Sequence, residues 1–179
     1  MEYPSIVFGG GCFWCIEAVF AEIHGVIRLE PGYAGGHTVN PTYQEVCSGV
    51  SGHAEVIRVY FDSEIINLVD LYEVFFATHD PTSMNRQGND IGTQYRSAVF
   101  YNSILQKEQA KAAIKAVDTS GAYPSKVVTT LEALEVFYPA EDGHIDYFNR
   151  NPETAYCSAV ISPKLHKFRK AFRKLLKSK

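Results

Sequence analysis

The sequence predicts a two-layer α+β fold, in which helices pack against a mixed or antiparallel sheet. Apolar patterns of helical and of strand period are both present, but they do not alternate in the strict β-α-β order of a doubly wound fold. Hairpin-like pairs of strand patterns also occur. The length of 179 residues is ordinary for a single domain with a sizeable core. We therefore expect residues 1–179 to form one domain.

The composition excludes several classes of protein. A net charge of −3 argues against a nucleic-acid binder, and no apolar stretch is long enough to cross a membrane. The first residues lack the basic and apolar regions of a secretory signal. Four cysteines in a chain with no visible leader indicate a reducing compartment, where thiols perform redox or metal chemistry. We therefore expect a cytoplasmic protein.

The first structural unit places a cysteine at the start of a helix. An apolar run at residues 6–8 predicts a buried strand, glycines occupy residues 9–11, and Cys12 follows. The next apolar residues share one helical face: Ile16, Val19, Phe20 and Ile23. Unpaired backbone N–H groups at a helix start favour an anion, so we expect Cys12 to have a depressed pKa and to be a thiolate nucleophile. The alternative is a small buried apolar residue, as many free cysteines are.

Two neighbours of Cys12 suggest further roles. Trp14 lies off the apolar helix face, and it either walls a pocket for an apolar group or packs on another element. Cys15 completes a Cys-x-x-Cys motif, whose spacing suits a reversible disulfide at a helix start. The same spacing supplies half of a zinc site, but the remaining cysteines form no second close pair, so we predict no metal site.

The next elements lead to a carboxylate on an apolar face. Residues 26–29 predict a strand, residues 31–37 a long turn, and residues 44–47 a short helix. Residues 53–61 predict a clear strand, with Glu55 in line with three apolar side chains. An acid at the end of an apolar face should have a raised pKa and could donate a proton near neutral pH. The alternative is a solvated strand end.

The second half of the chain combines regular elements with one long polar loop. The expected elements are a helix at 69–77, a strand at 98–101, a helix at 106–117, a strand at 127–136, a short polar helix at 140–149 and a basic amphipathic helix from Pro163. Residues 78–97 are rich in Asp, Asn and Gly, which indicates a shaped loop that supplies polar groups to a site. Segment 155–179 carries Cys157 in an expected mobile coil. We expect its helix to dock on the core rather than on a membrane.

Ordered motifs along nearly the whole chain resemble those of the A-type peptide methionine sulfoxide reductases. The motifs are Gly11-Cys12-Phe13-Trp14, Gly32-Tyr33-Ala34-Gly35-Gly36, Asn40-Pro41-Thr42-Tyr43, Gly52-His53-Ala54-Glu55, His79-Asp80-Pro81-Thr82, Asn85-Arg86-Gln87-Gly88, Asp90 and Gln94-Tyr95-Arg96-Ser97. The resemblance implies a single catalytic domain. It also implies a fold similar to the ferredoxin-like plait, with added helices and long loops.

The resemblance assigns catalytic roles to four residues. Cys12 would attack the sulfur of a methionine S-sulfoxide, in oxidised proteins and peptides or in the free amino acid, and Glu55 would protonate its oxygen. Tyr43 and Tyr95 would hydrogen-bond that oxygen. The residue chemistry agrees, because reduction of a sulfoxide needs a soft nucleophile for the sulfur and an acid for the oxygen.

Substrate binding is assigned by the resemblance to three further residues. Phe13 and Trp14 would wall a pocket for the S-methyl group, and Asp90 would help to anchor the substrate backbone. An uncharged sulfoxide cannot be held by ion pairing, so an apolar wall with hydroxyl donors suits it. No bound cofactor is implied, and we expect a monomer.

Recycling of the nucleophile requires a second thiol, because the reaction leaves a sulfenic acid on Cys12. Cys157 resembles the cysteine that follows Gly-Tyr near the C-terminus of many relatives, so we expect it to resolve the sulfenic acid. Cys15, where relatives commonly have glycine, is the auxiliary or alternative thiol. Thioredoxin, or dithiothreitol in vitro, would reduce the disulfide. Cys47 is treated as structural, and residues 140–147, where relatives usually read Tyr-His-Gln, have an open role.

Two other functions fit parts of the sequence. A general thiol–disulfide oxidoreductase would need Cys12 and Cys15 but not Glu55. A non-enzymatic metal-binding or redox-sensing domain would need only the cysteines. Turnover of methionine sulfoxide and metal analysis of the reduced protein distinguish these functions.

Overall fold

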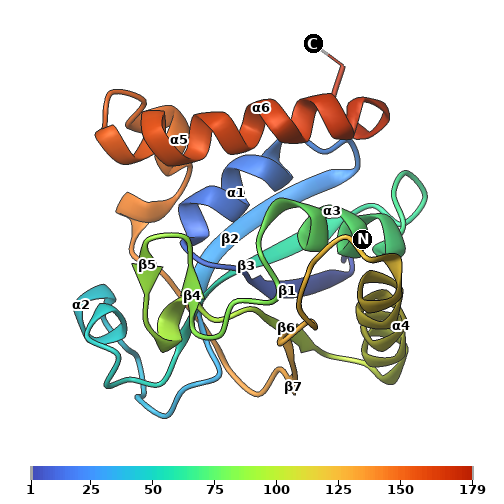
Figure 1. The fold of residues 1–179 in the computed structure, drawn as a ribbon. Coiled ribbons are helices and arrows are strands. Elements are labelled where there is room, and N and C mark those ends of the chain that lie inside the picture. Colours follow the sequence, from blue (N-terminus) through green and yellow to red (C-terminus); the bar gives the residue numbers. More distant parts are fainter. Residues whose placement is uncertain (1, 179) are drawn as a thin grey trace.

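The computed structural model describes residues 2–178 and confirms a mixed α+β fold (Figure 1). Six strands form one sheet in the order β7-β6-β1-β3-β2-β8. Neighbouring strands are antiparallel, except that β6 and β7 are parallel. The strands are β1 (Ser5–Gly9), β2 (Val26–Ala34), β3 (Ala54–Phe61), β6 (Ala98–Tyr101), β7 (Thr130–Ala133) and β8 (Phe137–Pro139). The short strands β4 (Arg86–Gln87) and β5 (Asp90–Ile91) form a separate hairpin.

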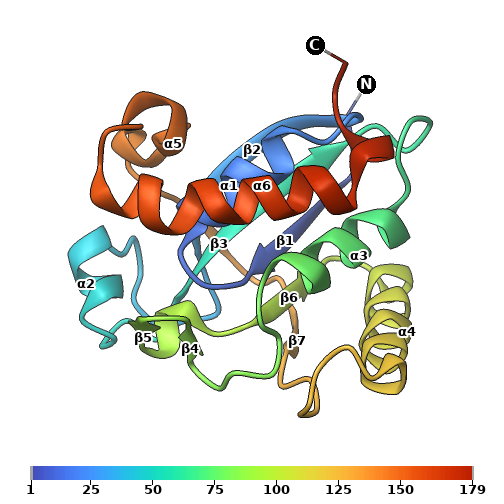
Figure 2. The same ribbon diagram turned by 45° about the horizontal axis from the view of Figure 1, so that its top comes forward.

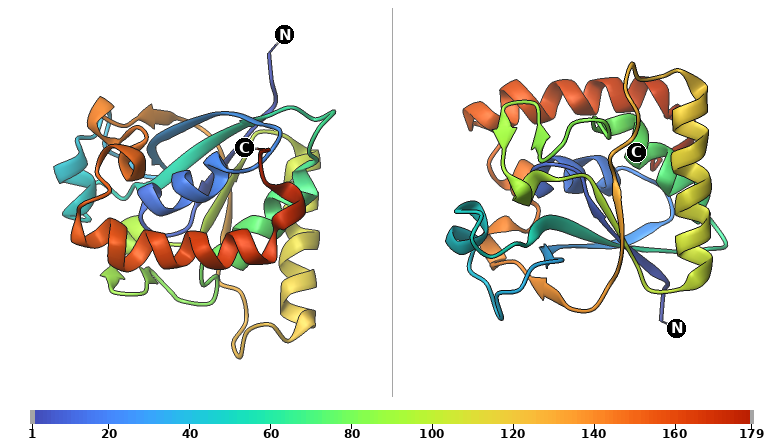
Figure 3. Two further views of the ribbon diagram at one scale, coloured as in Figure 1. Left: turned by 90° about the horizontal axis from the view of Figure 1, so that it is seen from above. Right: turned by 60° about the horizontal axis from the view of Figure 1, so that its bottom comes forward.

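Helices cover one face of the sheet. α1 (Phe13–Ala21) lies against β2 and β3, and α6 (Ser162–Ala171) lies over α1 (Figure 2). α3 (Leu68–Thr78) packs beside α1, while α4 (Ile104–Ser120) stands at the edge of the sheet near β6 (Figure 3). Fully buried aromatic side chains fill this layer: Phe8, Phe13, Phe20, Phe75 and Phe168. Within residues 2–178, no helix combines the length and the apolar character that a membrane span requires.

The strand expected at residues 26–29 is longer than predicted, because β2 continues to Ala34. Gly32 lies in this strand between β3 and β8. A Cβ atom at Gly32 would lie 2.3 Å from Phe137 Cζ, so glycine allows the close approach of β8 and does not make a turn. The turn expected at residues 31–37 therefore begins only after Ala34.

The strand expected at residues 127–136 is shorter than predicted, because β7 covers only Thr130–Ala133. The chain then crosses from this edge of the sheet to the opposite edge, where it forms β8. The polar helix expected at residues 140–149 is wrong, because the segment forms a 3₁₀ turn (Asp142–His144) and then α5 (Tyr147–Arg150). Asp146 between them has a φ of +52°, a left-handed conformation that interrupts a helix.

The C-terminal segment is helical around Cys157, where a mobile coil was expected. A π-helical turn (Cys157–Ile161) leads directly into α6, and the Cys157 side chain is fully buried. The basic helix docks on the core as predicted, through Leu165 and Phe168. Packing against α1 therefore orders a segment that looked mobile from its sequence.

Candidate active site

Cys12 lies at the start of α1, as the sequence predicts. β1 ends at Gly9, Gly11 turns the chain with a φ of +93°, and Cys12 is the N-cap residue of the helix. A Cβ atom at Gly11 would lie 2.6 Å from Gln87 Cγ, so both the conformation and the space require glycine there. Cys12 is only 8% exposed, so the protein encloses most of the nucleophile.

The expected depressed pKa of Cys12 is wrong for the resting protein. Burial raises the pKa of this thiol well above its ordinary value, and a hydrogen bond with the Cys15 thiol and the nearby Glu55 carboxyl raise it further. The helix start opposes these effects through the backbone N–H of Trp14, which lowers the pKa by less than burial raises it. Cys12 therefore rests as a protonated thiol.

Glu55 is a buried carboxyl next to the helix start. It lies on β3, is 1% exposed, and accepts the backbone N–H of Phe13 through Oε2 at 3.1 Å. Burial raises its pKa to about 8, so the group carries a proton at neutral pH, as predicted. Oε1 has no hydrogen-bond partner among the described residues. A buried acid with one free oxygen can give a hydrogen bond or a proton to a bound oxygen atom.

Tyr43 and Tyr95 place phenol groups near this carboxyl. Tyr43 opens the short helix α2 (Tyr43–Cys47), and Tyr95 ends a 3₁₀ turn (Thr93–Tyr95). Burial raises the pKa of both phenols, and the charge that Glu55 carries when ionised raises it further. Both phenols therefore stay protonated and can donate hydrogen bonds over the whole neutral range.

Aromatic rings pack together next to Cys12. The Phe13 ring stacks with Tyr43 at a centroid distance of 6.3 Å, and Trp14 stacks on Tyr147 of α5 at 3.7 Å. The His144 ring lies 4.4 Å from the Tyr43 ring, and its Nδ1 accepts the indole N–H of Trp14 at 3.1 Å. The segment whose role the sequence left open thus supplies two rings to this aromatic group.

Glu17 connects α1 to the aromatic group. It lies one turn after Trp14, is 6% exposed, and accepts the backbone N–H of Asp146 at 3.0 Å and that of Tyr147. These two hydrogen bonds give a partner to backbone N–H groups at the start of α5, and so hold the Tyr147 ring against Trp14. Burial raises the pKa of Glu17 to about 7. Sequence reasoning missed this residue, although an acid between Ile16 and Ala18 in an apolar helix was a visible signal.

A second missed carboxylate is Glu141, just before the 3₁₀ turn. It accepts the Tyr33 hydroxyl at 2.7 Å and the backbone N–H of Tyr43 at 2.8 Å. These bonds join β2 and α2 to the segment that carries His144. No periodic pattern marks Glu141, because its neighbours form no regular element.

A chain of polar contacts links Asp90 to the thiols. The Tyr156 hydroxyl donates to Asp90 Oδ2 at 2.7 Å and lies 3.5 Å from Cys15 Sγ. Cys15 interacts in turn with the Cys12 thiol, and this hydrogen bond lowers the pKa of Cys15 to about 7 in spite of burial. Asp90, the expected anchor of a substrate backbone, is therefore only one side chain away from the Cys-x-x-Cys motif.

Cys15 is the cysteine that interacts with Cys12, through a hydrogen bond between the two thiols. Cys157 is fully buried in the core, and Cys47 is half-buried and hydrogen-bonded to the Tyr43 hydroxyl. All four cysteines are free thiols.

The fold and the site together define a thiol-dependent oxidoreductase, in which a buried cysteine at a helix start lies beside a protonated carboxyl. The profile described as "Peptide methionine sulfoxide reductase" matches residues 4–176. The chain belongs to this family.

Individual comparisons agree with this assignment. A "Peptide methionine sulfoxide reductase MsrA" of Erwinia tasmaniensis is 55% identical over 173 residues, which are 96% of each chain. Reduced Mxr1 of Saccharomyces cerevisiae has a similar structure, with a TM-score of 0.77, 34% identity, and coverage of 87% of this chain and 90% of that chain. Mxr1 in complex with Trx2 matches with a TM-score of 0.53 and 26% identity, over 82% of this chain and 85% of that chain.

Proposed function

We propose that the protein reduces the S epimer of methionine sulfoxide, free or within oxidised proteins and peptides, to methionine. The observation that carries this proposal is the buried, protonated carboxyl of Glu55, which is bonded to the residue after Cys12 and keeps Oε1 free. An acid in this position can face the oxygen of a sulfoxide while the thiol faces its sulfur. Family membership supports this substrate, because the relatives are named for it.

The chemical step exchanges protons between two groups that both start protonated. Cys12 Sγ attacks the sulfoxide sulfur as Glu55 gives its proton to the oxygen, and the thiol proton replaces the one that Glu55 loses. The substrate S–O bond and the new bond between the two sulfurs then break, the protonated oxygen forms a bond to Cys12 Sγ as a sulfenic acid, and methionine leaves. Two electrons move from the thiol sulfur to the substrate sulfur. The raised pKa of Cys12 is compatible with this route, because the thiolate forms only as the acid acts.

Five residues position the substrate for this step. Tyr43 and Tyr95 donate hydrogen bonds to the oxygen and keep it near the acid. Phe13 and Trp14 form an apolar wall for the S-methyl group, which their stacked surroundings support. Asp90 accepts a hydrogen bond from the substrate backbone. Such contacts select an uncharged sulfoxide by shape and hydrogen bonding rather than by charge.

The sulfenic acid is resolved by Cys157, with Cys15 as an auxiliary thiol. Condensation forms the S–S bond and releases water. Cys157 lies buried in a helical turn, whereas Cys15 already forms a hydrogen bond with Cys12. Mass mapping of the oxidised protein under non-reducing conditions should show a bridge to Cys157. A lone Cys12–Cys15 bridge would assign the resolving step to Cys15 instead.

Thioredoxin then reduces the disulfide by thiol exchange. The yeast complex of Mxr1 with Trx2 supports this reductant. We further propose a monomeric catalytic domain without a bound cofactor, in the cytoplasm, where four free thiols stay reduced. The strand order β6-β1-β3-β2, with helices on one face, supports a ferredoxin-like plait as its core.

Turnover of separated epimers tests the proposed function. With dithiothreitol as the reductant, the wild type should consume only the S epimer, and Cys12→Ser should consume neither. Equal consumption of the R epimer would contradict the stereochemical assignment. Turnover by Cys12→Ser at the wild-type rate would show that Cys12 is not the nucleophile.

A general thiol–disulfide oxidoreductase is the second candidate. The lowered pKa of Cys15 beside Cys12 favours it, because a reactive dithiol needs one thiol that ionises readily. This activity does not use Glu55. If Glu55→Gln loses disulfide reduction as well as sulfoxide reduction, the result would therefore contradict the general oxidoreductase. If it loses sulfoxide reduction alone, the result supports the sulfoxide reductase.

A further inference from the structure

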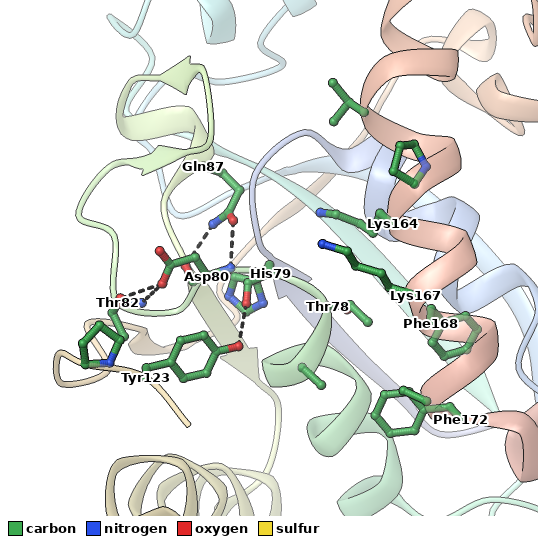
Figure 4. Close-up of a pocket in the computed structure, with 15 residues that line it drawn as sticks. Thr78, His79, Asp80, Thr82, Gln87, Tyr123, Lys164, Lys167, Phe168 and Phe172 are labelled. Atoms are coloured by element: carbon green, nitrogen blue, oxygen red, sulfur yellow. Dashed lines mark hydrogen bonds between the residues drawn. The ribbon is translucent and has the colours of Figure 1, made fainter. Parts of the chain in front are cut away.

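A cavity of about 570 Å³ lies between α6 and the segment that follows α3 (Figure 4). One wall is formed by α6, with Lys164, Lys167, Phe168 and Phe172. The opposite wall includes Gln87 and the residues after α3, and the catalytic residues proposed above do not line it. The cavity is therefore distinct from the aromatic group around the nucleophile.

The wall opposite α6 uses its polar groups internally. The Asp80 carboxylate accepts the backbone N–H and the hydroxyl of Thr82, at 2.9 and 2.6 Å. The Gln87 amide bonds to the backbone of Asp80 at both ends, and the Tyr123 hydroxyl donates to the carbonyls of Phe76 and His79. Among residues 2–178, Asp80 therefore carries the one carboxylate that lines the cavity, and two lysines on the other wall outnumber it.

The α6 wall presents two cations to the same cavity. The ammonium groups of Lys164 and Lys167 extend from the helix toward the opposite wall (Figure 4). Neither lysine forms an ion pair within residues 2–178. The half-buried ring of Phe172 also lines this wall and supplies apolar surface. A ligand that suits this wall has a negative charge at the end of a short apolar stem.

The cavity adjoins the candidate active site through its two walls. Gln87 packs against Gly11, where an added Cβ would meet it at 2.6 Å, and it pairs directly with Asp90 across the β4–β5 hairpin. Paired residues of antiparallel strands lie about 5 Å apart. On the other wall, the charge of Lys164 acts on the Cys15 thiol. A peptide that is anchored at Asp90 therefore reaches the cavity within a few residues, since an extended chain advances about 3.3 Å per residue.

We propose that this cavity is a substrate subsite that receives an acidic side chain, Asp or Glu, which flanks the methionine sulfoxide in an oxidised protein. The carboxylate lies between Lys164 and Lys167, and its methylene groups contact Phe172. This inference rests on the proposed function and adds a sequence preference to it. It also gives a role to the basic face of the C-terminal helix, which sulfoxide chemistry does not use.

The test compares two peptides that differ only in charge. Each carries one methionine S-sulfoxide, flanked on both sides by Glu in one peptide and by Gln in the other, and dithiothreitol is the reductant. The wild type should prefer the Glu peptide by about fivefold in kcat/KM, because one effective ion pair contributes about that factor. The preference should appear in KM and should disappear at high salt, since the pair is partly solvated.

Variants of one lysine locate the effect. Lys167→Gln should remove most of the preference for the Glu peptide, and Lys167→Glu should reverse it. Lys170→Gln is the matched control, because Lys170 is exposed on the same helix but does not line the cavity. A preference that survives in Lys167→Glu, or that falls equally in Lys170→Gln, would overturn the proposal. An effect seen only with thioredoxin as reductant would also overturn it, because the acidic segment would then belong to the reductant.

A binding measurement tests this inference independently of the proposed function. Isothermal titration with the same peptides, carrying methionine in place of the sulfoxide, measures the charge preference without turnover. If the wild type reduces neither sulfoxide peptide, the proposed function fails, while the titration still decides the subsite. If both peptides are reduced and bound equally, the subsite fails and the reductase remains.

Discussion

Glu55 Oε2 accepts the backbone N–H of Phe13 at 3.1 Å, which ties a buried carboxyl on β3 to the first residue of α1. Because Cys12 immediately precedes Phe13, this one contact sets the position of the acid relative to the nucleophile. A carboxylate on Glu55 and a thiolate on Cys12 would repel each other, so ionisation of one group disfavours ionisation of the other. The pair therefore favours the state in which both groups are protonated, which is the starting state of the proposed reaction.

Replacement of Glu55 by Gln should abolish most of the activity without disrupting the fold. We expect kcat/KM for methionine sulfoxide to fall at least about a hundredfold, since a general acid contributes roughly 10²–10⁴. The amide oxygen can still accept the Phe13 N–H, so the thermal midpoint should stay near that of the wild type. Turnover within twofold of the wild type would show that Glu55 is not the acid.

The pH dependence of the reductive step should follow Glu55. Single-turnover methionine formation should be constant near pH 7 and fall as pH rises through about 8, because the acid loses its proton there. A mechanism limited by Cys12 ionisation predicts the opposite sign, a rate that increases with pH. Glu55→Gln should lack the fall above pH 8, and a fall retained in that variant would assign the titration to another group.

The parts of the site that were predictable depend on contacts close in sequence or on strict alternation. Cys12 follows a strand and a glycine turn, and Glu55 shares a face with apolar residues, so both positions are readable from the sequence. Tyr43, Tyr95 and Asp90 lie in short elements joined by loops, where only a resemblance to known motifs singled them out. Local patterns do not indicate which loops meet.

What could not be predicted depends on packing between distant segments. The pKa of Cys12 is raised because other elements bury its thiol, an effect that the helix start alone does not show. The conformation after residue 140 depends on Glu17, which bonds to the start of α5 from another helix. The crossing from β7 to β8 likewise depends on pairing with β6 and with β2, far away in the sequence.

Gly11→Ala should destabilise the protein by about 2 kcal/mol and reduce its activity. A φ of +93° costs an L-residue roughly 1–2 kcal/mol, and the added Cβ would lie 2.6 Å from Gln87 Cγ. Relief of this clash moves the turn that places Cys12. Urea unfolding and kcat/KM measure the two effects.

Two other glycines serve as controls that separate the cost of a positive φ from the cost of a steric clash. Gly88 has a φ of +59°, and a Cβ added there would meet no described atom within 4 Å, so Gly88→Ala should show only the conformational cost. Gly143 has neither a positive φ nor a close neighbour among the described residues, so Gly143→Ala should be nearly neutral. Equal stability of Gly11→Ala and Gly143→Ala would contradict the requirement for glycine before the nucleophile.

Glu17→Ala should loosen α5 and weaken substrate binding, although Glu17 does not touch the proposed substrate. Loss of its bonds to the backbone of Asp146 and Tyr147 should cost about 1–2 kcal/mol and release Tyr147 from Trp14. Trp14 is the only tryptophan, so its fluorescence reports this contact directly. We expect an altered emission spectrum and a KM several times higher, with a smaller change in kcat. Glu17→Gln keeps an acceptor oxygen and should restore both, whereas an unchanged spectrum and KM in Glu17→Ala would show that α5 is placed by other contacts.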